Sequence, residues 1–219
     1  MDEDDERSDN RASQGLGRTL ALSDGIFAIA MTLLAFQIQP KDLKQNLLPN
    51  HLAEALGKAG DQYFVFFLSF AVIGLLWLAH HRLFNRIGRA DEVLMTVNLL
   101  FLMTIAALPF PSALLGQYGS ERAAVVLYAA SMSVAGMLLV SLTLLARHRR
   151  LLMPGTDPQA VNKGLLRSGI MAGVFALSIP VAFVFSPAVA SDSWLLIWLS
   201  MMATRLVHRR AKPAVDLDA

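Results

Sequence analysis

"GRTLALSDGIFAIAMTLLAFQI", residues 17–38, has the length and composition of a membrane-spanning helix, yet its first turns carry ionisable residues. A bilayer core about 30 Å thick requires about 20 mostly apolar residues per helix. Arg18 and Asp24 lie inside such a stretch, where a charged side chain is costly unless it has a partner. The function of this segment therefore depends on what these two side chains face.

The composition of the whole chain favours an integral membrane protein. Of its 219 residues, 55% are hydrophobic and only 16% are charged, a balance that is unusual for a soluble domain. The net charge of +2 is too small to indicate a nucleic-acid-binding protein. Because the chain has no cysteine, disulfides, thiolate metal sites and a cysteine nucleophile are excluded.

Hydropathy divides the chain into six predicted transmembrane helices, which makes the expected fold an all-α integral membrane protein. The helices are expected at residues 17–39, 62–81, 93–115, 123–146, 166–189 and 192–208. The membrane domain then covers residues 17–208, between a disordered acidic tail at 1–16 and a second tail at 209–219. Pro180 interrupts the fifth helix, and a proline kink is tolerated inside a helix bundle.

The basic residues predict the orientation of the chain in the membrane. With six spans both termini face the same side, and fifteen of the 19 lysines and arginines lie on that side. This bias predicts a multi-pass protein of the cell membrane with both termini in the cytoplasm. No connection exceeds about 22 residues, so there is no room for a separate catalytic domain, and no nucleophile or metal triad is evident within one layer. We therefore do not expect an enzyme.

Polar residues of the first three helices are predicted to meet at one depth near the cytoplasmic side. The first and third helices enter from that side and the second leaves toward it. The layer is expected to contain Arg18, Ser23, Asp24, Trp77, His81 and Asn98. Two interpretations are open: a polar clamp that fixes the helices in register, or a proton relay or ligand site. A metal site is less well supported, because His80 and His81 are adjacent and point in different directions.

An apolar stripe runs along the rest of the first helix. Its residues follow one another at intervals of four, three, four and three: Leu22, Ile26, Ile29, Leu33 and Phe36. Asp24 is rotated about 140° from Ile29, so the carboxylate can face the protein while the stripe meets something else. Thr32 is the only hydroxyl-bearing residue near the stripe. Periodicity alone leaves two alternatives open, packing against helices or lipid and the lining of a pore.

Three segments in the same order resemble the transmembrane protein 175 family of endolysosomal and prokaryotic potassium channels. They are "RTLALSDGIFAIAMTLL" from Arg18, "WLAHHRLF" from Trp77 and "NLLFLMTIAALPFPSALLGQY" from Asn98. The resemblance covers roughly residues 17–128. Leu22 stands where the family usually has phenylalanine, which is a conservative departure.

The resemblance implies a homotetramer in which four copies of the first helix surround a pathway for potassium ions. Carried over to this chain, the narrowest point falls on Ile29, followed by Leu33 and Phe36, with Thr32 beside them. Leu22 and Ile26 are then pore-facing. The implied function is a leak-like, potassium-preferring cation channel that needs no cofactor and whose partners are its own copies and the bilayer.

Two absences in the sequence agree with that expectation. No segment resembles the carbonyl filter "TVGYG", so selectivity is not expected from a ring of backbone carbonyls. No helix carries the repeated arginines of a voltage sensor, so voltage gating is not expected. The alternative function is a proton-coupled secondary transporter or proton channel that uses the layer around Asp24 and His81, although the two related halves typical of many transporters are not evident.

Overall fold

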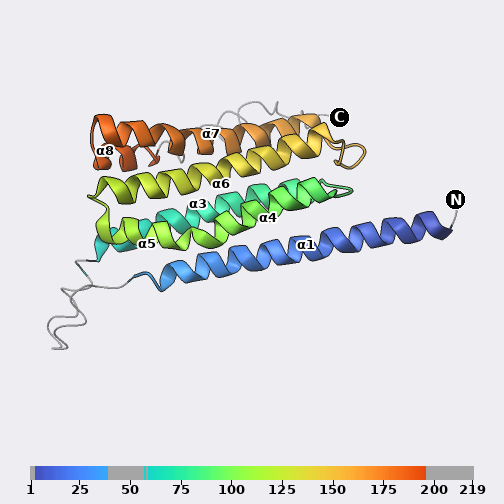
Figure 1. The fold of residues 1–219 in the computed structure, drawn as a ribbon, viewed down its shortest axis with the longest axis horizontal. Helices are drawn as coiled ribbons and strands as arrows, with labels where there is room; N and C mark the ends of the chain where they lie inside the picture. Colours follow the sequence, from blue (N-terminus) through green and yellow to red (C-terminus); the bar gives the residue numbers. More distant parts are fainter. Residues whose placement is uncertain (1–2, 39–56, 58, 196–219) are drawn as a thin grey trace, which may run out of the picture.

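The computed structural model describes residues 3–38, 57 and 59–195, and it forms a layered bundle of helices (Figure 1). The described helices are α1 (Glu3–Ala35), α3 (Gly60–Phe84), α4 (Glu92–Ala107), α5 (Pro109–Tyr118), α6 (Arg122–His148), α7 (Pro158–Val184) and α8 (Pro187–Asp192). α1 lies along one edge of the bundle, α6 and α7 along the opposite edge, and α3, α4 and α5 between them. The all-α prediction is confirmed.

Within the described residues, five helical segments are long and apolar enough to cross a membrane, which makes the chain a multi-pass membrane protein. They are Gly15–Ala35, Gly60–Phe84, Glu92–Tyr118, Arg122–His148 and Pro158–Val184. They correspond in order to the first five predicted helices. The sixth, at residues 192–208, falls almost entirely outside the described residues.

Two helices, α1 and α7, begin earlier than hydropathy predicts. α1 begins at Glu3, so the helix continues upstream through residues for which the sequence predicts a disordered tail. α7 begins at Pro158, eight residues before the predicted start at 166. Asp157 caps it by accepting a hydrogen bond from the backbone N–H of Gln159 at 2.8 Å, and proline is favoured in a first helical turn.

The third membrane span is broken into two helices at Leu108. α4 ends at Ala107 and α5 begins at Pro109, because proline has no N–H to continue the helical hydrogen bonds. The backbone N–H of Leu108 instead bonds to the carbonyl of Ile105 at 3.1 Å. The Ser112 hydroxyl donates to the carbonyl of Leu108 at 2.9 Å, which adds a side-chain hydrogen bond at the break.

α6 and α7 pack closely because small residues face each other. A Cβ atom at Gly136 would lie 2.8 Å from the Cβ of Ala172, so only glycine fits there without a shift. The Ser133 hydroxyl donates to the carbonyl of Ala172 at 3.3 Å. At the other end of this pair, Arg122 Nε donates to the carbonyl of Ala182 at 2.9 Å. Close approach with interhelical hydrogen bonds is how membrane helices associate in the absence of a hydrophobic driving force.

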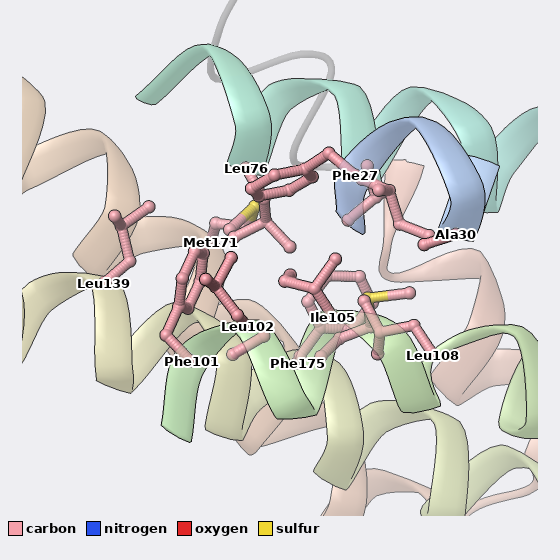
Figure 2. Packing of buried hydrophobic residues seen from close by; sticks show 14 of the residues in the cluster. Phe27, Ala30, Leu76, Phe101, Leu102, Ile105, Leu108, Leu139, Met171 and Phe175 are labelled. Atoms are coloured by element: carbon pink, nitrogen blue, oxygen red, sulfur yellow. The ribbon is translucent and has the colours of Figure 1, made fainter. Parts of the chain in front are cut away.

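One continuous apolar core joins the layers of the bundle. Phe27 and Ala30 of α1 meet Leu76 of α3 and Phe101 and Ile105 of α4 near its centre (Figure 2). All five residues are at most 1% exposed. One face of α1 is therefore fixed by the core of its own chain, and this decides which face of the helix stays exposed.

Asp91 links the turn before α4 to the end of α6. Its carboxylate accepts a hydrogen bond from the backbone N–H of Leu94 at 2.8 Å and pairs with Arg149 Nη1 at 2.8 Å. The hydrogen bond from Leu94, followed by the hydrogen bond and charge of Arg149, lowers the pKa of Asp91 below its ordinary value. A carboxyl group whose pKa is lower in the folded state stabilises the fold above its unfolded pKa, and this contribution is lost as pH falls through the folded pKa.

We therefore expect Asp91→Asn, which keeps an acceptor for the helix cap, to lower the thermal stability slightly at about pH 7. The difference from the wild type should shrink as the pH falls below about 4, where the wild-type carboxyl also becomes neutral. Thermal unfolding of the two purified proteins in detergent at both pH values measures this. A stability difference of the same size at both pH values would show that it does not come from the ionised carboxylate of Asp91.

Candidate functional site

The predicted stripe of α1 lies on the face that the rest of the chain leaves uncovered. Leu22 is 55% exposed, Ile29 60%, Leu33 43% and Phe36 76%. The face that packs into the bundle carries Phe27, Ala30 and Leu34, each at most 1% exposed. α1 thus has one face fixed by the core and an opposite apolar face that must be covered by lipid or by another subunit.

Ile26, a member of the stripe, and Thr32, beside it, differ from the other stripe residues in what their side chains contact. Ile26 is partly buried and packs against the core. Thr32 is exposed, and its hydroxyl donates to the carbonyl of Ile29 in the same helix at 2.9 Å. Ile26 therefore lies at the margin of the exposed face, and the Thr32 hydroxyl bonds to the backbone of its own helix.

A second row on α1 consists of small residues, which the sequence analysis did not identify. The row comprises Ala21, Gly25, Ala28, Thr32 and Ala35, which repeat at intervals of four and three beside the stripe. All five are exposed, and a Cβ atom at Gly25 would have no neighbour within 4 Å. Small residues allow membrane helices to approach closely, and the same spacing that defines the stripe would have identified this row.

Asp24 is held by the aromatic residues at the end of α3. Trp77 Nε1 donates to its carboxylate at 2.7 Å. His81 Nδ1 lies 3.8 Å from the same carboxylate oxygen, which is an ion pair only when the imidazole is protonated. The indole and imidazole rings are 5.3 Å apart, so the two side chains approach Asp24 together. This contact ties α1 to α3.

Asn98 bonds to a histidine that the sequence analysis did not place in the polar layer. Its Oδ1 lies 2.8 Å from His80 Nε2, and the imidazole is fully buried. The His80 ring stacks on Phe84 at 4.3 Å and on Phe101 at 5.3 Å. The expected single cluster is thus two adjacent ones, Asp24 with Trp77 and His81 and Asn98 with His80, because neighbouring histidines on a helix point about 100° apart.

The structure does not bring Arg18 and Ser23 into contact with the Asp24 carboxylate. The Ser23 hydroxyl is buried and donates to the carbonyl of Thr19 at 2.9 Å. Arg18 is exposed, and it lies eleven residues before Ile29, a rotation of about 20°. Arg18 therefore lies in line with the apolar stripe, on the side of α1 away from Asp24. Within the described residues, no group of three or more His, Asp or Glu side chains could hold a metal ion.

Comparison with known proteins relates both the fold and these residues to one family. Residues 18–109 match the family model described as "Endosomal/lysosomal potassium channel TMEM175". The chain is 36% identical over 185 residues to a protein of Streptomyces collinus named a potassium channel, covering 82% of this chain and 88% of that protein. It is 41% identical over 98 residues to the rat "Endosomal/lysosomal proton channel TMEM175", covering 42% of this chain and 19% of that protein.

Among solved structures, the fold is similar to that of a crystallised channel. This is the lysosomal potassium-selective channel TMEM175 homolog from Chamaesiphon minutus, with a TM-score of 0.73 and 27% sequence identity. The match covers 87% of this chain and 98% of that one. The arrangement of the helices and the sequence matches agree, and the chain belongs to the TMEM175 family.

Proposed function

We propose that the chain is a potassium channel of the cell membrane in which α1 from each of four identical subunits lines the ion pathway. The observation that supports this most directly is the apolar stripe of α1, exposed opposite a face that is fully packed. The relatives named potassium channels and the potassium-selective structural relative support the choice of ion. The channel is leak-like and not voltage-gated, with both termini in the cytoplasm.

The two rows on α1 support assembly of identical chains around an axis, and the number four is the one that the family resemblance implies. One apolar helix cannot enclose a pathway, and identical stripes close most simply around a rotation axis. The small residues beside the stripe, such as Gly25 and Ala28, leave room for a neighbouring subunit to approach. The stripe of each subunit would then face the axis while the small residues contact the next subunit.

The constriction lies at Ile29, with Leu33 as the next layer and Phe36 toward the other mouth. A ring of four isoleucine side chains can bring the wall close enough to exclude water, which creates a barrier to ions without a carbonyl filter. Such a neck penalises sodium more than potassium because sodium holds its hydration shell more tightly. Thr32 lies next to the ring, and its hydroxyl, which donates to the Ile29 carbonyl, can still accept a hydrogen bond from nearby water through its oxygen.

Ion flux into liposomes tests the proposal. With purified protein and a potassium gradient but no proton gradient, we expect potassium flux and a clearly smaller flux of sodium under the matching sodium gradient. Protein-free liposomes and liposomes containing heat-denatured protein are the controls. Flux that occurs only when a proton gradient is imposed would replace the channel by a proton-coupled transporter, and cross-linking that yields no species beyond a monomer would refute the assembly.

A second candidate function is proton conduction, which one contact favours. His81 Nδ1 is shielded from solvent, has no hydrogen-bond partner among the described residues and lies 3.8 Å from Asp24. A small movement would close this distance and form a hydrogen bond between the imidazole and the carboxylate, along which a proton could pass. The rat relative named a proton channel points the same way. Asp24→Asn should leave potassium flux intact under the primary proposal, whereas loss of a measured proton flux in this variant would favour the second.

Asp24 and Trp77 should act mainly in assembly and helix register. Asp24→Ala leaves the indole N–H of Trp77 without its acceptor, and we expect a loss of about 1–3 kcal/mol of stability, toward the lower value because Asp24 is partly exposed. Trp77→Phe removes the donor and is the matched variant. Thermal unfolding of both single variants and the double variant measures the coupling, and strictly additive losses would contradict a direct contribution of this hydrogen bond.

A further inference from the structure

A pocket of about 230 Å³ lies between α3, α6 and α7, away from the stripe of α1. Four basic residues line it: Arg82, Arg86, Lys163 and Arg167. Arg82 is in the last turn of α3, and Lys163 and Arg167 are in the first three turns of α7. The α3–α4 and α6–α7 connections lie at the same end of the bundle as the N-terminus (Figure 1), so the four cations gather at that end.

The pocket has no acidic lining residue to balance these charges. Within the described part of the chain, none of the four basic side chains forms an ion pair or a hydrogen bond. Other arginines at this end do have partners, since Arg149 pairs with Asp91 and Arg147 with Asn162. Four like charges around one cavity repel one another unless an anion lies between them.

The interior of the pocket combines apolar surface with two hydroxyls. Leu83, Leu139 and Val161 are nearly fully buried beneath it, and Thr143 and Ser168 are 7% and 4% exposed. Thr143 donates to the carbonyl of Leu139 at 2.9 Å and keeps lone pairs free. This lining suits a ligand that has a phosphate oxygen for the guanidinium groups and apolar atoms for the interior.

The position of the pocket along α7 identifies the source of such a ligand. α7 has 27 residues and is therefore about 40 Å long, close to the thickness of a bilayer with its headgroups. Arg167 lies 17 residues, about 26 Å, from the other end of α7 at Val184. Because the hydrocarbon core is about 30 Å thick, Arg167 is near the boundary between headgroups and hydrocarbon when Val184 lies at the opposite boundary. A charge at that depth requires a partner, and lipid phosphates are located there.

We propose that this pocket binds the headgroup of an anionic phospholipid, with Arg82, Arg86, Lys163 and Arg167 holding the phosphate. Basic pockets between membrane helices are suited to such headgroups. The bound lipid joins the end of α3 to the beginning of α7 and so couples the central layer of the bundle to its outer layer. The site lies outside the ion pathway and does not depend on which ion the protein conducts.

The test compares lipid binding by two double variants of equal charge. Arg82→Gln/Arg167→Gln alters the pocket, and Arg89→Gln/Arg150→Gln removes two exposed arginines at the same end that do not line it. Native mass spectrometry and thermal unfolding are measured after addition of phosphatidylglycerol or phosphatidylcholine. We expect phosphatidylglycerol to bind and stabilise the wild type and the Arg89/Arg150 variant, with binding at least about tenfold weaker in the Arg82/Arg167 variant.

Three outcomes would overturn the proposal. Equal weakening in both double variants would indicate diffuse attraction by surface charge, and equal binding of phosphatidylcholine would remove the requirement for an anionic headgroup. The same stabilisation by inorganic phosphate would identify a soluble anion as the ligand. If the pocket double variant does not fold, the single variants at the exposed residues Arg82 and Lys163 replace it. Because no ion flux is measured, failure here leaves the proposed channel function untouched.

Discussion

Replacing Ile29 with asparagine should raise ion conductance by about tenfold and bring the potassium and sodium permeabilities close to each other. Ile29 is 60% exposed within its subunit, on the face that we assign to the pathway. A polar amide ring in place of isoleucine would hold water in the neck and lower the barrier that dewetting creates. Lowering a barrier by about 1.4 kcal/mol raises a rate tenfold. Single-channel recording or liposome flux with each ion measures the change.

Phe27→Asn is the matched control because the position lies two residues away on the opposite face of α1. Phe27 is fully buried, and its ring lies 5.8 Å from His80 and 5.9 Å from Phe101. Placing an amide there removes aromatic packing and buries a polar group, so we expect misfolding or low expression with no selective change in permeability. A loss of selectivity only in the Phe27 variant would mean that the wrong face of α1 has been assigned to the pore.

Gly136→Ala should destabilise the subunit by about 1–3 kcal/mol, although it adds only one methyl group. The new Cβ would lie 2.8 Å from the Cβ and 3.1 Å from the Cα of Ala172. α6 and α7 would have to separate, which lengthens the hydrogen bond from Ser133 to the Ala172 carbonyl. Denaturant or thermal unfolding in detergent micelles, followed by circular dichroism, measures the loss.

Two further variants separate this effect from helix propensity. At Gly173 a Cβ atom would have no neighbour within 4 Å, so Gly173→Ala should be neutral or stabilising by up to about 1 kcal/mol. Combining Gly136→Ala with Ala172→Gly removes the closest contact and should restore part of the stability. Equal stability of the Gly136 and Gly173 variants would show that α6 and α7 tolerate separation at this point.

The sequence predicts the helices of this chain well because membrane spans depend on length and hydropathy alone. It also predicts which face of α1 the rest of the chain leaves exposed, since a rotation of 100° per residue separates exposed Ile29 from buried Phe27. Hydropathy does not predict the break at Leu108. An average over 20 residues contains no information about the backbone hydrogen bonds that Pro109 and Pro111 remove.

The polar contacts could be predicted only in part. Helix rise gives the depth of a residue and places Asp24, Trp77 and Asn98 near one level. In the structure Asp24 bonds to Trp77, and Asn98 bonds to His80, which is three residues further along α3. Depth does not say which of two adjacent histidines faces which helix, and that depends on the rotation of α3 against α1 and α4. The pairing of His80 with Asn98 and of His81 with Asp24 therefore required the structure.

The break in the third span allows α4 to move without an equal movement of α5. An unbroken helix transmits a push at one end to the other, whereas two helices joined at Leu108 can pivot. α1 packs against both pieces, with Phe27 on Phe101 of α4 and its later residues beside α5. If α4 tilts at Leu108, it would move the middle of α1, while α5 stays packed against α3. Movement of the neck that we propose at Ile29 would then require only half of the third span to move.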